Sequence, residues 1–102
     1  MSEFTGGWII GNFTPTLHHN GEFEVSIKRF KKGQSEPSHK QLTATEISVV
    51  IEGQVRLANE ILVSNQIGVI EPQEFASFEA LEDSIIVCIK FPSLPTDKVL
   101  KI

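Results

Sequence analysis

The chain has 102 residues, of which 40% are hydrophobic and 22% charged, with a formal net charge of -4 and a pI near 5.3. This length suits one domain with its own core. The acidic balance argues against nucleic acid, which requires a basic surface, and no apolar run approaches the roughly 18 residues of a membrane span. The N-terminus lacks the pattern of a signal peptide, and Cys88 is the single cysteine, so we expect a cytoplasmic protein without disulfides.

Short strands separated by turns follow one another along the whole chain. Trp8 to Phe13 predicts a first strand, and residues 23–28 alternate apolar and polar side chains at the period of a half-buried strand. Ile47 to Ile51 and 55–57 predict two more strands, joined by a hairpin turn at Glu52-Gly53-Gln54.

Further strands are predicted at 61–63 and 68–70. In 75–80, Phe75 and Ser77 fall on one face and Ala76, Phe78 and Ala80 on the other. Residues 85–91 are apolar on both faces and predict a central strand. No stretch has a helical period, so the pattern predicts an all-β sandwich or barrel.

A polar group stands out between Gly33 and Gly53. His39 and Gln41 are two residues apart, so in a strand they share a face. Glu46 is an odd number of residues from both, and a bend at Thr43 to Thr45 would let it converge on them.

This segment resembles the first motif of the cupin family: Gly, five residues, His-x-His, three or four residues, Glu, six residues, Gly. Gly33, His39, Glu46 and Gly53 occupy these positions, and Gln41 replaces the second His. Aligned on Pro72, the second cupin motif keeps only the proline and puts Ser77 in place of its histidine.

The resemblance implies a double-stranded β-helix, the jelly-roll barrel of the cupins. It further implies a single domain over 1–102, with a barrel core at about 23–91, an N-terminal strand at about 8–13 and a tail at 92–102. The tail either wraps over the barrel or reaches toward a partner. A homodimer is expected, because small cupins commonly pair and because exposed edge strands need a partner or a cover.

In metal-binding cupins four side chains hold a divalent ion, and their places here are taken by His39, Gln41, Glu46 and Ser77. Gln41 and Ser77 offer only neutral oxygens, so the resemblance implies at most a weakly bound ion (Mn, Fe, Zn or Mg) on His39, Gln41 and Glu46. Two other interpretations of His39 and Glu46 stay open. They form a hydrogen-bonded structural pair, or a metal-free acid–base pair.

Two function classes follow. The first is a module that binds a small polar molecule, sugar-like or carboxylate-like, in the barrel through His39, Gln41, Glu46 and Ser77, with a degenerate metal site. The alternative is a metal-dependent enzyme of the isomerase, lyase or dioxygenase type that uses His39, Gln41 and Glu46. His18 and His19 are interpreted as an exposed loop, although either could supply a ligand at the barrel mouth. Cys88 is interpreted as a buried small hydrophobe, and the basic cluster that begins with Lys28 as solvated.

Overall fold

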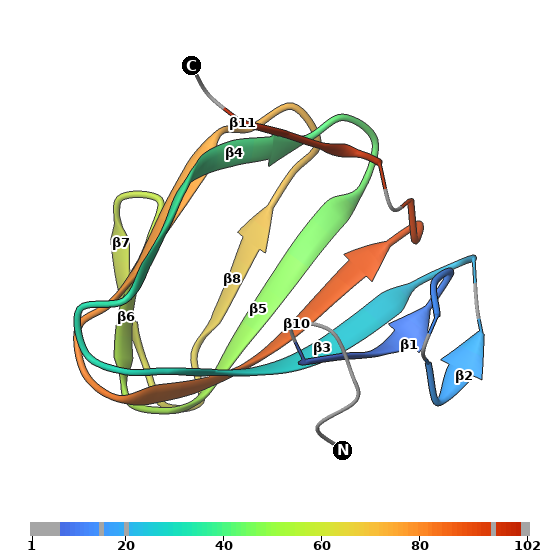
Figure 1. The fold of residues 1–102 in the computed structure, drawn as a ribbon. Coiled ribbons are helices and arrows are strands. Elements are labelled where there is room, and N and C mark those ends of the chain that lie inside the picture. The colour runs from blue at the N-terminus through green and yellow to red at the C-terminus, as the bar shows by residue number, and fades with distance from the viewer. Residues whose placement is uncertain (1–6, 15, 20, 95, 101–102) are drawn as a thin grey trace.

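Two β-sheets curl around a common interior, and the chain passes repeatedly from one sheet to the other (Figure 1). The computed structural model describes residues 7–14, 16–19, 21–94 and 96–100. The six-stranded sheet has the order β2 (His18–His19), β1 (Trp8–Gly11), β3 (Glu24–Phe30), β10 (Ser84–Phe91), β5 (Thr45–Glu52), β8 (Ile67–Ile70). The five-stranded sheet has the order β11 (Lys98–Leu100), β4 (Ser35–Gln41), β9 (Ala76–Ala80), β6 (Gln54–Leu57), β7 (Glu60–Val63). The prediction of an all-β jelly-roll barrel is confirmed.

The apolar core fills one end of the interior. Phe78 of β9 and Phe30 of β3 pack with ring centroids 4.5 Å apart, and Val50 and Val55 are fully buried beside them. The other buried members of this cluster come from both sheets: Leu57, Leu62, Ile70, Ala76, Ala80 and Ile86. Side chains that alternate along each strand therefore divide between this core and the outer faces, as the period-two pattern predicts.

Strand β10 is the central strand that its apolar sequence predicts. It pairs antiparallel with β3 on one side and β5 on the other. The alternation predicted for β9 is also confirmed, because Ala76, Phe78 and Ala80 are buried whereas Ser77 is exposed.

The prediction of a hairpin at Gly53 is wrong. Strands β5 and β6 flank this glycine but belong to different sheets, so Gly53 forms a corner between sheets. Its φ of 99° is the left-handed conformation that favours glycine. A Cβ there would also clash with Ser84 and with the carbonyl oxygen of Asp83. The glycine signal is therefore correct, but the pairing inferred from it is not.

Two smaller expectations are resolved at the sheet edges. His18 and His19 form the short edge strand β2 instead of a loop, although both are exposed as expected. The tail wraps over the barrel, because β11 pairs antiparallel with β4 at the edge of the five-stranded sheet. None of the described segments is a helix long and apolar enough to cross a membrane.

Candidate functional site

The end of the interior opposite the apolar core is lined by polar side chains in cross-strand rows. Lys90 of β10 pairs with Glu24 of β3 on one side and Glu46 of β5 on the other. The neighbouring row is also polar and consists of Ser26, Cys88 and Ser48. Directly paired residues share a face, so both rows point into the barrel.

Strand β4 closes this polar end from the other sheet, and a β-bulge sets its side chains. Glu36 pairs with the buried Phe78 and His39 with the buried Ala76, so three steps along β4 match two along β9. The extra residue in Pro37-Ser38 turns both Glu36 and His39 inward, although their odd spacing would otherwise put them on opposite faces. Gln41 follows on the same face and is only 3% exposed.

Three of the four predicted site residues line one inner cavity. His39, Glu46 and Ser77 all contact it, together with the unpredicted Glu36 and Lys28. Its volume of about 30 Å³ leaves room for one or two water molecules. This space is too small for a sugar or an organic acid, whose pockets usually measure several hundred Å³.

His39 and Glu46 have separate partners. The Nδ1 atom of His39 lies 3.1 Å from the carbonyl oxygen of Pro37, and because a carbonyl can only accept, Nδ1 donates a proton in this hydrogen bond. The Sγ atom of Cys88 donates to Glu46 Oε1 over 3.3 Å. The hydrogen bonds of the described residues therefore give no support to a His39–Glu46 structural pair.

The donor set does not fit a tightly bound metal. Ser77 borders the inner cavity but is exposed, on the face of β9 opposite to the buried Ala76 and Phe78, and the residue paired with His39 is Ala76, which offers no ligand atom. Within the described part of the chain, no group of three His, Cys, Asp or Glu side chains is placed to hold a metal ion.

Gln41 lies in a second cavity at the barrel mouth, with a volume of about 330 Å³. Its Nε2 atom is one of two buried side-chain polar atoms without a hydrogen-bond partner among the described residues, the other being Ser26 Oγ. The walls of this mouth cavity combine aromatic, aliphatic and charged side chains: Trp8, Phe13, Thr14, Glu24, Lys28, Gln41, Lys90, Leu94 and Lys98. Lys28 lines the mouth cavity and the inner cavity, so the two adjoin at its side chain.

The lysines of the mouth cavity are held loosely. Lys90 Nζ lies 3.9 Å from Glu24 Oε1, and Lys28 Nζ lies 3.7 Å from Glu36 Oε2. Both ammonium groups also sit over the ring of Trp8, at 4.7 and 5.0 Å from its centroid. Of the basic cluster expected to be solvated, Arg29, Lys31 and Lys32 are exposed, whereas the side chain of Lys28 is largely covered by the barrel.

Burial raises the pKa of two acidic groups in this region, Glu24 and Cys88. It raises the pKa of Glu24, an effect that Lys90 and the Ser93 hydroxyl only partly offset and that nearby Glu46 reinforces. Burial also raises the pKa of the Cys88 thiol, and the Glu46 carboxylate adds to this effect. Cys88 is therefore an unreactive buried thiol, as expected.

Asp97 fixes the loop that joins β4 to β5. Its carboxylate accepts the backbone N–H groups of Thr43 and Ala44 at 2.9–3.0 Å, and its carbonyl oxygen accepts that of Leu42. Burial acts to raise the pKa of Asp97, but the backbone hydrogen bonds from Ala44 and Thr43 outweigh burial and lower it. The clamp holds the predicted bend between Gln41 and Glu46 in place.

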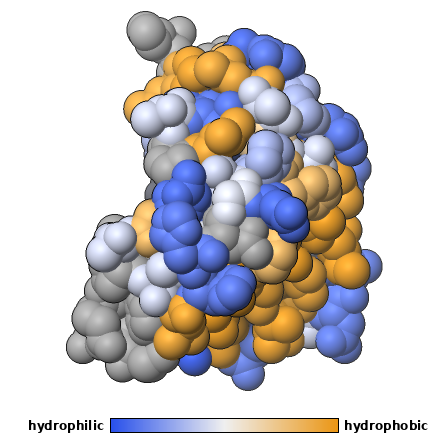
Figure 2. Space-filling view, turned by 90° about the vertical axis from the view of Figure 1, so that its right-hand side faces the viewer, coloured by the Kyte–Doolittle hydropathy of each residue, from blue (hydrophilic) through white to orange (hydrophobic). Residues whose placement is uncertain are grey.

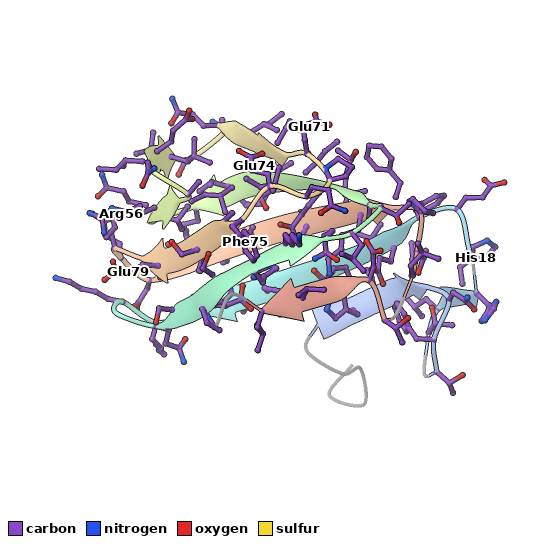
Figure 3. All side chains as sticks on the ribbon, turned by 90° about the horizontal axis from the view of Figure 1, so that it is seen from above. His18, Arg56, Glu71, Glu74, Phe75 and Glu79 are labelled. Atoms are coloured by element: carbon purple, nitrogen blue, oxygen red, sulfur yellow. The ribbon has the colours of Figure 1, made fainter. Side chains whose placement is uncertain are left out.

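His18 does not reach the site. Figure 3 places it at the far edge of the molecule, on β2, with its side chain pointing away from the barrel. Within the described residues, neither His18 nor His19 lines the inner cavity or the mouth cavity. They therefore do not replace the missing ligands.

Comparison with known proteins identifies the fold. No protein-family model and no curated protein matches the chain. Among solved structures, an uncharacterized Klebsiella pneumoniae protein with a double-stranded β-helix domain superposes with a TM-score of 0.72 at 19% identity, over 79% of this chain and 71% of that one. An RmlC-like cupin from Shewanella frigidimarina gives a TM-score of 0.69 at 18% identity, over 74% and 71% of the two chains. The chain has the cupin fold.

Proteins that share this cupin fold have varied roles. KdgF from Halomonas gives a TM-score of 0.69 at 18% identity, over 74% of this chain and 75% of that one. Oxalate oxidase in complex with the substrate analogue glycolate gives 0.65 at 17% identity, over 78% and 46% of the chains. At such identities the likeness establishes the architecture, and the role depends on the residues of this site.

The sequence pattern does not reveal the charged residues around the two cavities. Lys90 continues the period-two series of the inward-facing Ile86 and Cys88, and its inward direction could have been predicted from this alternation. The inward direction of Glu36 depends on the bulge, and the tail that contains Lys98 has no period, so the pattern predicts neither residue as part of the site.

Proposed function

We propose that this cupin barrel binds a small organic carboxylate in the mouth cavity. Its volume of about 330 Å³ falls within the range usual for small-molecule sites, unlike that of the inner cavity. Gln41 then binds the ligand, as the sequence predicts. The ligand lies outward of His39, Glu46 and Ser77, which line an inner cavity with room only for water.

The charge of the cavity favours an anion. Three lysines, Lys28, Lys90 and Lys98, and one acidic residue, Glu24, line the cavity, whereas the whole chain carries a net charge of -4. Lys90 and Lys28 contact their acidic partners only at 3.9 and 3.7 Å, beyond a normal hydrogen bond. A bound carboxylate would offer these lysines closer, charge-assisted hydrogen bonds.

The observation that carries the proposal is the buried, unpartnered Nε2 of Gln41. A buried amide donor without an acceptor costs about 1–3 kcal/mol, so folded proteins rarely keep one without a reason. Strand pairing sets Lys98 of β11 directly beside Gln41. A carboxylate oxygen at this point would accept from the amide and from an ammonium group together.

The two ammonium groups over the ring of Trp8 favour a carboxylate over a neutral sugar. Sugars commonly stack on an open indole face, but here two ammonium groups lie within 5.0 Å of the ring centroid. The oxalate oxidase complex supports the class of ligand, because it holds glycolate within the same fold. A weakly bound divalent ion, and with it a metal-dependent enzyme, remains the second prediction.

Titration calorimetry with glycolate, and with ethylene glycol as its uncharged analogue, tests the proposal. Glycolate should bind and ethylene glycol should not. Gln41→Leu should weaken glycolate binding by about tenfold or more, because a hydrogen bond to a charged group contributes about 1.5–3 kcal/mol. Lys98→Gln should weaken it several-fold, whereas Lys32→Gln, an exposed lysine outside the cavity, should have no effect.

Equal binding of the two compounds, or glycolate binding unchanged in Gln41→Leu, would contradict the proposal. Binding that appears only when Mn²⁺ is added, and disappears in His39→Ala, would favour the metal-dependent alternative instead.

A further inference from the structure

The outer face of the six-stranded sheet is apolar over four adjacent strands. Its pairings define two outward rows, each of four β-branched residues. The first row is Val25, Ile89, Ile47 and Val69, and the second is Ile27, Val87, Val49 and Ile67. No charged side chain interrupts these eight positions. Ile67 is 58% exposed, Val69 49% and Ile27 39%.

Such a face is unusual on the outside of a small protein, because contiguous apolar patches of this kind generally mark interaction sites. Figure 2 views the molecule from the side of β1 and β2 and shows hydrophobic surface gathered along its lower and right-hand parts. With a strand spacing of about 4.8 Å and a rise of about 3.3 Å per residue, the two rows and the next one cover roughly 400 Å² in projection. Side-chain relief enlarges this area, so two such faces together approach the total of about 1,000 Å² that separates specific interfaces from incidental contacts.

The next row shows which partner fits. Ile85 of β10 pairs with Arg29 on β3 and with Glu52 on β5, so opposite charges flank the central strand at the same height. Both side chains are exposed, and neither forms an ion pair within the described residues. A two-fold axis parallel to β10 would exchange the two flanks and set each Arg29 opposite the Glu52 of a second copy.

We propose that this face packs against the same face of a second copy about a two-fold axis along β10. The apolar rows are then self-complementary, since β3 of one copy lies over β5 of the other and β10 lies over itself. Two symmetric Arg29–Glu52 pairs close one end of the interface, as an isologous dimer requires. The sheets would lie about 10 Å apart, the normal spacing of packed sheets. This surface is separate from the mouth cavity and independent of ligand binding.

Sedimentation velocity of the full chain from about 1 to 500 µM tests the proposal, because an interface at the small end of the size range is commonly a weak one. We expect a mass twice the 11.3 kDa of the chain at the higher concentrations. A chain that remains monomeric throughout would overturn the proposal.

Charge reversal tests the axis. Arg29→Glu and Glu52→Arg, each alone, set two pairs of like charges against each other, and each should raise the dissociation constant by on the order of tenfold. The double variant Arg29→Glu/Glu52→Arg restores both pairs and should return the dissociation constant close to that of the natural chain. Both positions are exposed, so these variants leave the core intact. If neither single variant changes the dissociation constant of the dimer, the proposed axis is wrong.

Val87→Glu tests the face itself. It places two carboxylates together on the axis and should abolish the dimer. Its control is Val63→Glu, at an outward valine of β7 in the other sheet that is 43% exposed and thus more exposed than the half-buried Val87; this change should leave the dimer intact. Circular dichroism confirms that each variant is folded. A folded Val87→Glu dimer would overturn the proposal.

Discussion

Gln41→Leu is the change that best separates a ligand site from a structural network. In the ligand-free protein, Gln41 is 3% exposed and its Nε2 has no acceptor among the described residues. Leucine has a similar size and no polar atom to leave unpartnered. The cost of the unpartnered donor, about 1–3 kcal/mol, is therefore removed. We expect the free energy of unfolding to rise by about 1 kcal/mol, which in a domain of this size raises the Tm by about 4–8 °C.

Urea unfolding and thermal unfolding of both proteins, without ligand, measure this difference. Gln66→Leu is the matched control, because Gln66 Oε1 accepts the backbone N–H of Val63 at 2.9 Å. That variant loses a formed hydrogen bond and should be less stable by about 1 kcal/mol. The two Gln-to-Leu changes should thus have opposite signs.

A loss of stability in Gln41→Leu as large as that in the control would refute the reasoning. It would mean that the amide is already satisfied within the folded chain. The carboxylate proposal would then lose the observation that carries it.

Two further predictions concern pH and are checked by urea unfolding at a series of pH values. The pKa of Glu24 is raised in the folded state, so the natural chain loses stability as the pH rises from the unfolded-state pKa through the folded-state pKa. Glu24→Gln should remove that loss and should therefore be more stable than the natural chain at neutral pH. An advantage that does not grow with pH would contradict this. Because the pKa of Asp97 is lowered, its contribution is present at neutral pH and is lost as the pH falls through the folded-state pKa. Asp97→Asn should therefore cost about 1–3 kcal/mol at neutral pH and nothing once Asp97 is protonated; an equal cost at every pH would contradict this.

The local pattern of the sequence predicts most strands and the face of each. Alternation gives the inward side of β9, because burial on one face requires a period of two. The central place of β10 follows from its being apolar on both faces. The first cupin motif brings His39 and Glu46 to one cavity as expected. These successes rest on interactions within a strand or across one turn.

The errors arise where partners are distant in sequence. A glycine with positive φ serves a hairpin and a corner between sheets equally well, so Gly53 alone does not tell which strands pair. The mouth cavity is assembled from Trp8, Gln41, Lys90 and Lys98, which only the closed barrel brings together. Charged residues on inward faces are also counterintuitive, because a lysine in an alternating strand normally indicates the solvent side.

The bulge at Pro37-Ser38 lets this part of the site tolerate a change in chain length. Removing one of these two residues would give Glu36 and His39 an even spacing, so a regular ladder between β4 and β9 would still turn both side chains inward. A regular ladder that retained both residues would instead turn His39 and Gln41 toward solvent and bring Lys40 into the barrel. Loss of one codon at the bulge would therefore preserve the site, whereas loss of the Lys40 codon would put His39 and Gln41 on opposite faces of the strand.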